Sequence, residues 1–357
     1  MLWYCAYGAL VSPHMRDADL DLLRSFLTNA LLLVCTCRIT YFVTAGRKLW
    51  RERLLWLTYV MGFLATVSVF LGFFVAGWQE SVSTSGYRQA GVFVNPNTAS
   101  FQVLFFIATG FALAASRARV HWVTATLLIA APAILATSSR TGIIGFLSIP
   151  LGLAVIAFPG RNTNRAIITI LVSALIVGGG LAYGYRKAAN VDQAKRIRET
   201  IALVSLAVNG KLDRENTSAR TIIFSRAIEM IRYAPITGNG FGRMSRMPGL
   251  GVGPHNMFLL FLGEVGVLGT IPIVIAAYCY LKLGHHTDVR WQKVMVLGYF
   301  ACEFLSSMTS HNVFTDRPAT CMLGVSLGIL HSSETDIRSV LERRRRAGRT
   351  VPTEQSE

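Results

Sequence analysis

Apolar runs of about twenty residues alternate with short polar segments along most of the chain. Each run is long enough to cross a bilayer as a helix, which satisfies its own backbone hydrogen bonds in lipid. The pattern predicts an all-α polytopic membrane bundle of about nine or ten spans. The predicted segments are residues 22–44, 54–78, 98–116, 120–137, 142–158, 165–184, 255–281, 294–310 and 318–331.

The two ends of the chain depart from this pattern. Residues 2–12 are apolar but too short to span, so we expect an interfacial helix or part of a truncated first helix. Residues 332–357 form a basic tail. The composition, 52% hydrophobic and 15% charged, differs from that of soluble domains, which carry about 25% charged residues. We therefore expect one integral membrane domain over residues 1–357.

Positive charge is distributed unevenly between the loops. One set of loops, together with the C-terminal tail, holds seventeen Lys and Arg residues, whereas the alternate short loops hold only Arg16, Arg88, Arg140 and Arg317. Cytoplasmic loops are enriched in Lys and Arg. We therefore expect a protein of the cytoplasmic (inner) membrane with a cytoplasmic C-terminus. The loops expected to face outward, toward the periplasm or the exterior, are residues 79–97, 138–141, 185–254 and 309–317.

The loop 185–254 is the largest polar region and is strongly basic, with twelve Lys or Arg residues against five acidic ones. Nucleic acid is not expected as a partner on the outer side of a membrane. The positive charge has two possible partners. It could attract anionic lipid head groups of the membrane without a specific site, or it could bind a diphosphate-linked substrate. Within the loop, amphipathic patterns predict helices at residues 192–208 and 219–233.

A candidate anion site lies at the start of the second loop helix. Arg220 falls in its first turn, where Ser218 is placed to cap free N–H groups, and a helix start with a guanidinium suits a phosphate. His255 opens the next membrane segment and is a suitable base at neutral pH. Six glycines in residues 238–254 could wrap an anion, move as a lid or form a flexible connector. The alternative is a solvated basic loop beside a hydrogen-bonded His.

Two further polar features remain open. Glu264 lies about 13 Å along the helix that begins at His255, where it could orient a catalytic group or close an interhelical hydrogen bond. His311 and Asn312 repeat the His-Asn pair at another helix end that is expected to face outward. His311 could be a second functional histidine, or it could simply line a cavity. The six cysteines lie in apolar runs without metal-ligand spacing, so we expect neither a metal site nor a cofactor.

Four motifs follow one another on the expected outer side. They are RQAGVFVNPNTAS at 88–100, SSRTGIIGFL at 138–147, the Arg220 helix followed by PITGNGFG, and His255-Asn256 separated by nine residues from Gly-Val-Leu-Gly at 266–269. Together they resemble the O-antigen ligase and polysaccharide polymerase superfamily. The resemblance extends over residues 88–330. The sequence departs from the family pattern at Phe224. In the family, Leu or Trp often occupies this position, four residues after the loop arginine.

The resemblance implies a metal-independent glycosyltransferase. Such an enzyme moves a glycan from a polyprenyl diphosphate carrier to a lipid or glycan acceptor on the outer side of the membrane. By position, the resemblance assigns diphosphate binding to Arg140 and Arg220 and activation of the acceptor hydroxyl to His255. We also expect Arg88 to bind the diphosphate. The residues expected to support the site are Asn95, Asn97, Asn256, Glu264 and His311.

Two other functions fit the same sequence. A polymerase joins carrier-linked repeat units to one another and would use the same anion clamp. It would need sites for two carrier-linked partners, whereas only one outer loop is strongly basic. A transporter of a small anion or lipid-linked sugar would contain broken helices and buried charges near the midplane. Glu264 and the glycines in 266–269 leave this third function open.

Overall fold

The computed structural model describes residues 17–71, 90–93, 95–158, 160–187, 218–244, 247, 253–254, 256–309 and 316–349. These residues are almost entirely helical and include no strand, which confirms the all-α class. The helices are α2 (Asp17–Thr44), α3 (Lys48–Leu71), α5 (Pro96–Arg117), α6 (His121–Thr137), α7 (Arg140–Ala157), α8 (Arg161–Lys187), α10 (Ser218–Tyr233), α11 (Met257–His286), α12 (Arg290–Thr309) and α13 (Arg317–Arg349).

Each apolar segment predicted to span the membrane falls largely or wholly on one of these helices. Five of them are long and apolar enough to cross a membrane by length and composition, while α6 is apolar but shorter. The number of spans therefore stays a prediction. The expected segments 2–12 and 192–208 lie outside the described residues. The five candidate spans are Leu23–Thr44, Pro96–Arg117, Arg140–Ala157, Asn162–Gly180 and Met257–His286.

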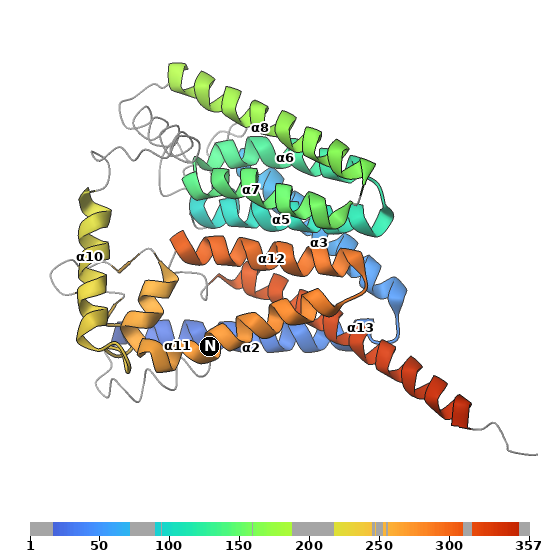
Figure 1. The fold of residues 1–357 in the computed structure, drawn as a ribbon. Coiled ribbons are helices and arrows are strands. Elements are labelled where there is room, and N and C mark those ends of the chain that lie inside the picture. The colour runs from blue at the N-terminus through green and yellow to red at the C-terminus, as the bar shows by residue number, and fades with distance from the viewer. Residues whose placement is uncertain are drawn as a thin grey trace, which may run out of the picture.

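Helix α5 forms the centre of the bundle. It is buried over most of its length, and α3, α6, α7 and α12 pack around it (Figure 1). Close approach depends on small residues, because a Cβ at Gly298 on α12 would lie 2.7 Å from the Cβ of Ala108. The hydroxyls of Thr109 and Tyr299 hydrogen bond over 2.8 Å at the same α5–α12 interface. Tight packing and this buried bond fix α12 against α5.

Helices α2 and α13 form a second closely packed pair, although they come from opposite ends of the chain (Figure 1). A Cβ at Gly328 would lie 2.5 Å from the carbonyl oxygen of Cys37, so the glycine allows the two backbones to approach. Thr44 donates a hydrogen bond to Ser332 over 2.9 Å. Helix α13 continues through most of the basic tail, as far as Arg349.

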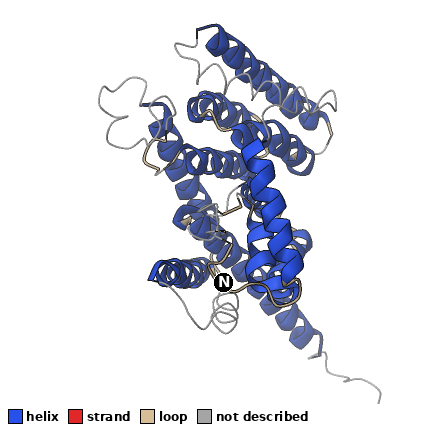
Figure 2. Cartoon of the chain, turned by 90° about the vertical axis from the view of Figure 1, so that its left-hand side faces the viewer, coloured by secondary structure: helices blue, strands red, loops and turns tan. Residues whose placement is uncertain are grey.

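Helix α10 lies across one end of the bundle, where α11 begins (Figure 1), and Figure 2 shows it in front when that end faces the viewer. Its range, Ser218–Tyr233, confirms the second predicted loop helix, with Ser218 as the first helical residue. Ala227 is completely buried. It belongs to an apolar cluster with Phe241, Met244, Met257, Leu260, Phe261 and Val265, which attaches α10 to the first part of α11.

Candidate functional site

The starts of α5, α7, α11 and α13 lie at one end of the bundle. Hydrogen bonds join them there: Ser100 to Ser139 between α5 and α7, and Gln102 to Asp316 between α5 and the residue before α13. The start of α11 is tied to the end of α12 by Asn256, whose Nδ2 donates to the carbonyl oxygen of Met308 over 3.2 Å. Helix N-termini carry free N–H groups and partial positive charge, so this end favours anions.

The SSRTG motif forms a tight turn that places Arg140 at the start of α7. Ser138 ends α6 in the left-handed conformation, with φ 48°. Ser139 caps α7, since its Oγ accepts from the amide of Gly142 over 3.3 Å. Arg140 follows as the first residue of the helix, and its side chain is half-buried. Ser138, Ser139 and Gly142 thus form the turn and the cap, and they place Arg140 at a helix N-terminus.

The NPNTAS part of the first motif, residues 95–100, forms the start of α5. Asn95 is its N-cap, with Oδ1 accepting from the amide of Thr98 over 2.9 Å, and Pro96 occupies the first helical position. Asn97 is exposed in the first turn, and its carbonyl oxygen accepts from Ser100 over 2.7 Å. Asn95 thus has a capping role, whereas the Asn97 side chain lies at the surface of the same end.

Asn256 anchors the start of α11 in two directions. Its Oδ1 accepts from the amide of Leu259 over 3.1 Å, which makes it the N-cap, while its Nδ2 reaches the last turn of α12. The residue before it, His255, lies outside the described residues, as do Arg88 and His311. Arg220 lies in the first turn of α10, but its side chain is outside the described set.

Helix α11 is broken at Gly266, a feature that the sequence pattern did not predict. Gly266 has φ 61° and ψ −168°, which is non-helical, and only glycine adopts this combination readily. The expected continuous segment 255–281 is therefore two half-helices that meet at this residue. Glu264 lies directly before the break and is 0% exposed.

The glycine-rich loop after α10 fills the break. The amides of Asn239 and Gly240 donate to the carbonyl oxygens of Gly263 and Glu264 over 2.8 and 3.0 Å. In return, the amides of Val267 and Leu268 donate to the carbonyl oxygens of residues 235 and 236 over 3.0 and 3.2 Å. The loop thus replaces hydrogen bonds that the break removes from α11. The amides of Asn239 and Gly240 are therefore not available to wrap an anion, because both donate to α11. The lid hypothesis stays a prediction.

Asp316 contributes a half-buried carboxylate at this end that sequence reasoning missed. Gln102 donates to its Oδ2 over 3.3 Å, while its Oδ1 is buried and has no hydrogen-bond partner among the described residues. Burial raises the pKa of its carboxyl to about 6, against hydrogen bonds from Ala319 and Gln102 that favour the charged form. The order Asp-Arg-Pro at 316–318 is a helix-start signal that could have drawn attention to it.

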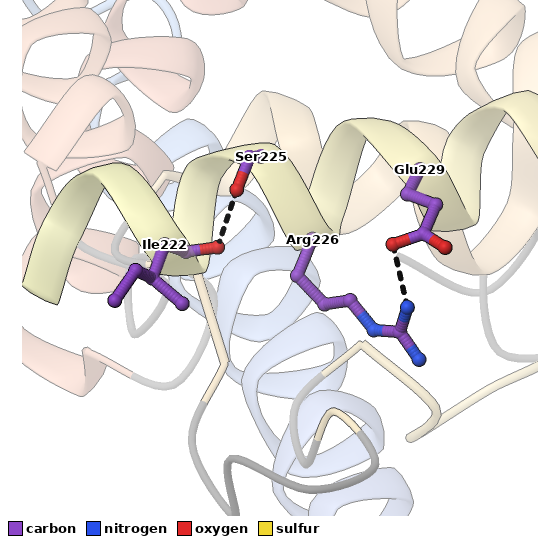
Figure 3. A network of polar contacts seen from close by, with 4 residues as sticks. All are labelled: Ile222, Ser225, Arg226 and Glu229. Carbon is purple, nitrogen blue, oxygen red and sulfur yellow. Dashed lines mark hydrogen bonds and ion pairs between the residues drawn. The ribbon is translucent and has the colours of Figure 1, made fainter.

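Within the described part of the chain, no three His, Cys, Asp or Glu side chains gather into a possible metal site. The described cationic features of this end include Arg140, the exposed Arg317 at the start of α13, and the helix N-termini. Arg226 is also cationic, but it lies on the exposed face of α10 and pairs with Glu229 over 2.5 Å (Figure 3).

Residues 125–274 match the family model described as O-Antigen ligase. The resemblance to this family is confirmed. No curated protein gives a significant match. The match supports a membrane protein of the O-antigen ligase and polymerase type, a glycosyltransferase-like enzyme class whose substrates are lipid-linked glycans.

The O-antigen ligase match extends from α6 through the broken part of α11. It therefore contains Arg140, Arg220, His255, Asn256 and Glu264. Arg88, Asn95 and Asn97 precede it, and His311 and Asp316 follow it. The structure brings this family region into contact with both flanking parts, because Ser139 bonds Ser100 and Asn256 bonds Met308.

Proposed function

We propose that the chain is a membrane glycosyltransferase of ligase type. It transfers a glycan from a polyprenyl diphosphate carrier to a lipid or glycan acceptor on the outer side of the cytoplasmic membrane. The observation that carries this proposal is the convergence of four helix N-termini at one end of the bundle, with Arg140 at the start of α7 and within the O-antigen ligase match. That end has the charge and N–H donors that a diphosphate requires.

In this proposal the diphosphate is held by guanidinium groups and helix N-termini. Arg140 and Arg220 bind its oxygens, and Arg88 reaches it from the preceding outer loop. Negative charge grows on the diphosphate as the glycosidic bond breaks. Donors fixed against that charge therefore stabilise the transition state more than the ground state. No metal ion is required by this arrangement, since the arginines supply the positive charge.

His255 acts as the general base. The acceptor hydroxyl oxygen attacks the anomeric carbon of the glycan, and its proton moves to the imidazole. The bond between that carbon and the diphosphate oxygen breaks, and the carrier leaves as free polyprenyl diphosphate. Asn256 supports this step by fixing the start of α11 directly after His255. Asn97 and His311 are supporting residues in this proposal.

The filled break in α11 favours an enzyme over a transporter. Transporters use the free backbone groups of broken helices to bind ions or substrates. Here the loop residues Asn239 and Gly240 occupy the carbonyl oxygens of Gly263 and Glu264. Those groups are therefore already paired within the chain.

The test uses purified full-length protein in a lipid environment and follows release of polyprenyl diphosphate from a carrier-linked glycan, with and without a lipid acceptor. We compare wild type with Arg220→Ala and His255→Ala. The matched controls are Arg226→Ala, an exposed arginine on the same helix, and His285→Ala, an exposed histidine at the far end of α11.

Acceptor-dependent release that both site variants lose and both controls keep would support the ligase. Release that requires only carrier-linked glycan and produces longer chains would replace it with a polymerase. No release from a folded wild type, under either condition, would refute the transferase and direct the next experiment to transport.

A further inference from the structure

One side chain joins the loop helix to the broken membrane helix. The Nδ2 of Asn239 donates to the carbonyl oxygen of Met230 on α10 over 2.9 Å and to that of Gly263 on α11 over 2.9 Å. We propose that Asn239 is a positioning residue that holds α10, and with it Arg220, in place against α11. The inference rests on the proposed function and extends it to a residue outside the expected site.

The geometry uses the full donor capacity of the amide. Both Nδ2 hydrogens meet carbonyl oxygens, and the backbone amide of Asn239 donates to Gly263 as well, over 2.8 Å. Met230 lies in the last turn of α10 and Gly263 in the last turn before the break, where carbonyl groups lack helical partners. Asn239 therefore caps two helix ends at once and joins them.

The apolar contact between α10 and α11 does not fix the position of α10 by itself. Ala227 and its neighbours bury apolar surface, which is a non-directional attraction. The opposite face of α10 is exposed, with Ile222 56% exposed, and carries the pair Arg226–Glu229 (Figure 3). Backbone bonds hold the following loop in the break, and the side chain of Asn239 adds directional bonds that reach α10 itself and oppose its sliding or turning on this apolar contact.

The effect reaches Arg220 through the helix. Arg220 lies ten residues before Met230 on α10, about 15 Å along its axis. A small rotation at the bonded end becomes a larger displacement at the other end. Misplacement of a binding group by about 1 Å can lower catalysis by about 100-fold. Asn239 thus controls donor binding without touching the donor.

The test compares Asn239→Asp and Asn239→Ala with wild type in full-length protein in nanodiscs. Aspartate has the shape of asparagine, but it places an oxygen opposite two carbonyl oxygens. The matched control is Asn164→Asp, the same change at an exposed position of α8. Hydrogen exchange reports the amides of Gly240, Val267 and Leu268, and donor-release kinetics report KM and kcat.

We expect at least about 10-fold faster exchange at these amides in Asn239→Asp, a smaller increase in Asn239→Ala and no change in the control. We expect kcat/KM to fall by about 10- to 100-fold, mainly through a higher KM for the carrier-linked donor. Folding is checked by the exchange of α5, which should remain protected in every variant.

Two results would overturn the proposal. Wild-type exchange in Asn239→Asp would mean that the side chain does not hold the loop in the break. Faster exchange with unchanged kinetics would mean that it holds the loop but positions nothing for the reaction. A wild type without transferase activity would refute the proposed function instead, and exchange alone would then decide whether Asn239 joins the two helices.

Discussion

The hydroxyls of Ser100 and Ser139 lie 3.0 Å apart and form a hydrogen bond between the starts of α5 and α7. Gly142 allows this approach, because a Cβ there would lie 2.6 Å from the Cβ of Ser100. Ser139 is also the N-cap of α7, directly before Arg140. The contact between the two helices therefore sets the position of Arg140.

Gly142→Ala should lower both stability and transferase activity. The added methyl group overlaps Ser100, and overpacking of this kind costs about 1–3 kcal/mol of unfolding free energy. Thermal unfolding in detergent measures this change. The control is Gly152→Ala on the same helix, where no atom lies within 4 Å of the new Cβ. Alanine is the better helix former there, so equal losses in the two variants would contradict the packing argument.

Gly266→Ala should separate the loop from α11. A Cβ at this position overlaps the carbonyl group of Ile236, and φ 61° with ψ −168° is strained for alanine by about 1–3 kcal/mol. We expect a lower unfolding temperature and faster hydrogen exchange at the amides of Gly238, Asn239 and Gly240. Gly178→Ala, on a face of α8 with no atom within 4 Å, serves as control. Unchanged exchange in Gly266→Ala would show that the break does not depend on glycine.

The sequence predicts the helices of this bundle well, because apolar runs and cap residues are local signals. Asn95-Pro96 and Ser139-Arg140 mark helix starts that the structure contains. The break in α11 was missed because Gly-Val-Leu-Gly continues the apolar pattern through it. Its cause is non-local: the groups that replace the lost hydrogen bonds come from a loop about 25 residues earlier.

The residues of the candidate site also fall into those that local sequence signals indicate and those whose contacts are distant in the sequence. The sequence indicates Arg140 and Asn256, since both stand at helix starts on the side expected to face outward. Asp316 carries a helix-start signal as well, but its partner Gln102 lies 214 residues away in the sequence. Asn239 gives no local signal at all, because a Gly-Asn-Gly sequence is typical of any turn.

Asp316 should make stability depend on pH. Burial raises the pKa of its carboxyl from 3.8 to about 6, so the folded chain binds this proton more tightly than the unfolded chain. The stabilisation is present below about pH 4 and is lost as pH rises through about 6, with a total of about 2–3 kcal/mol. Asp316→Asn should remove this dependence and be more stable than wild type at pH 7.5.

Unfolding temperatures at pH 4.5, 5.5 and 7.5 measure this effect. The amide side chain introduced by Asp316→Asn keeps a capping oxygen for the N–H of Ala319, so helix α13 should still begin at the same place. Asp288→Asn, at an exposed loop position, is the control and should follow the wild-type profile. Parallel profiles for wild type and Asp316→Asn would contradict the assignment of this titration to Asp316.

Arg140→Lys should lower donor turnover by about 100-fold or more while leaving the fold intact. Lysine keeps the positive charge at the start of α7, but it loses the planar pair of donors that binds a diphosphate through two oxygens. The same change at Arg119, which is exposed at the opposite end of the bundle, is the matched control and should leave turnover unchanged. Release of polyprenyl diphosphate measures turnover, and thermal unfolding checks the fold. Wild-type turnover in Arg140→Lys would mean that charge alone suffices at this helix start and that the guanidinium does not clamp the diphosphate.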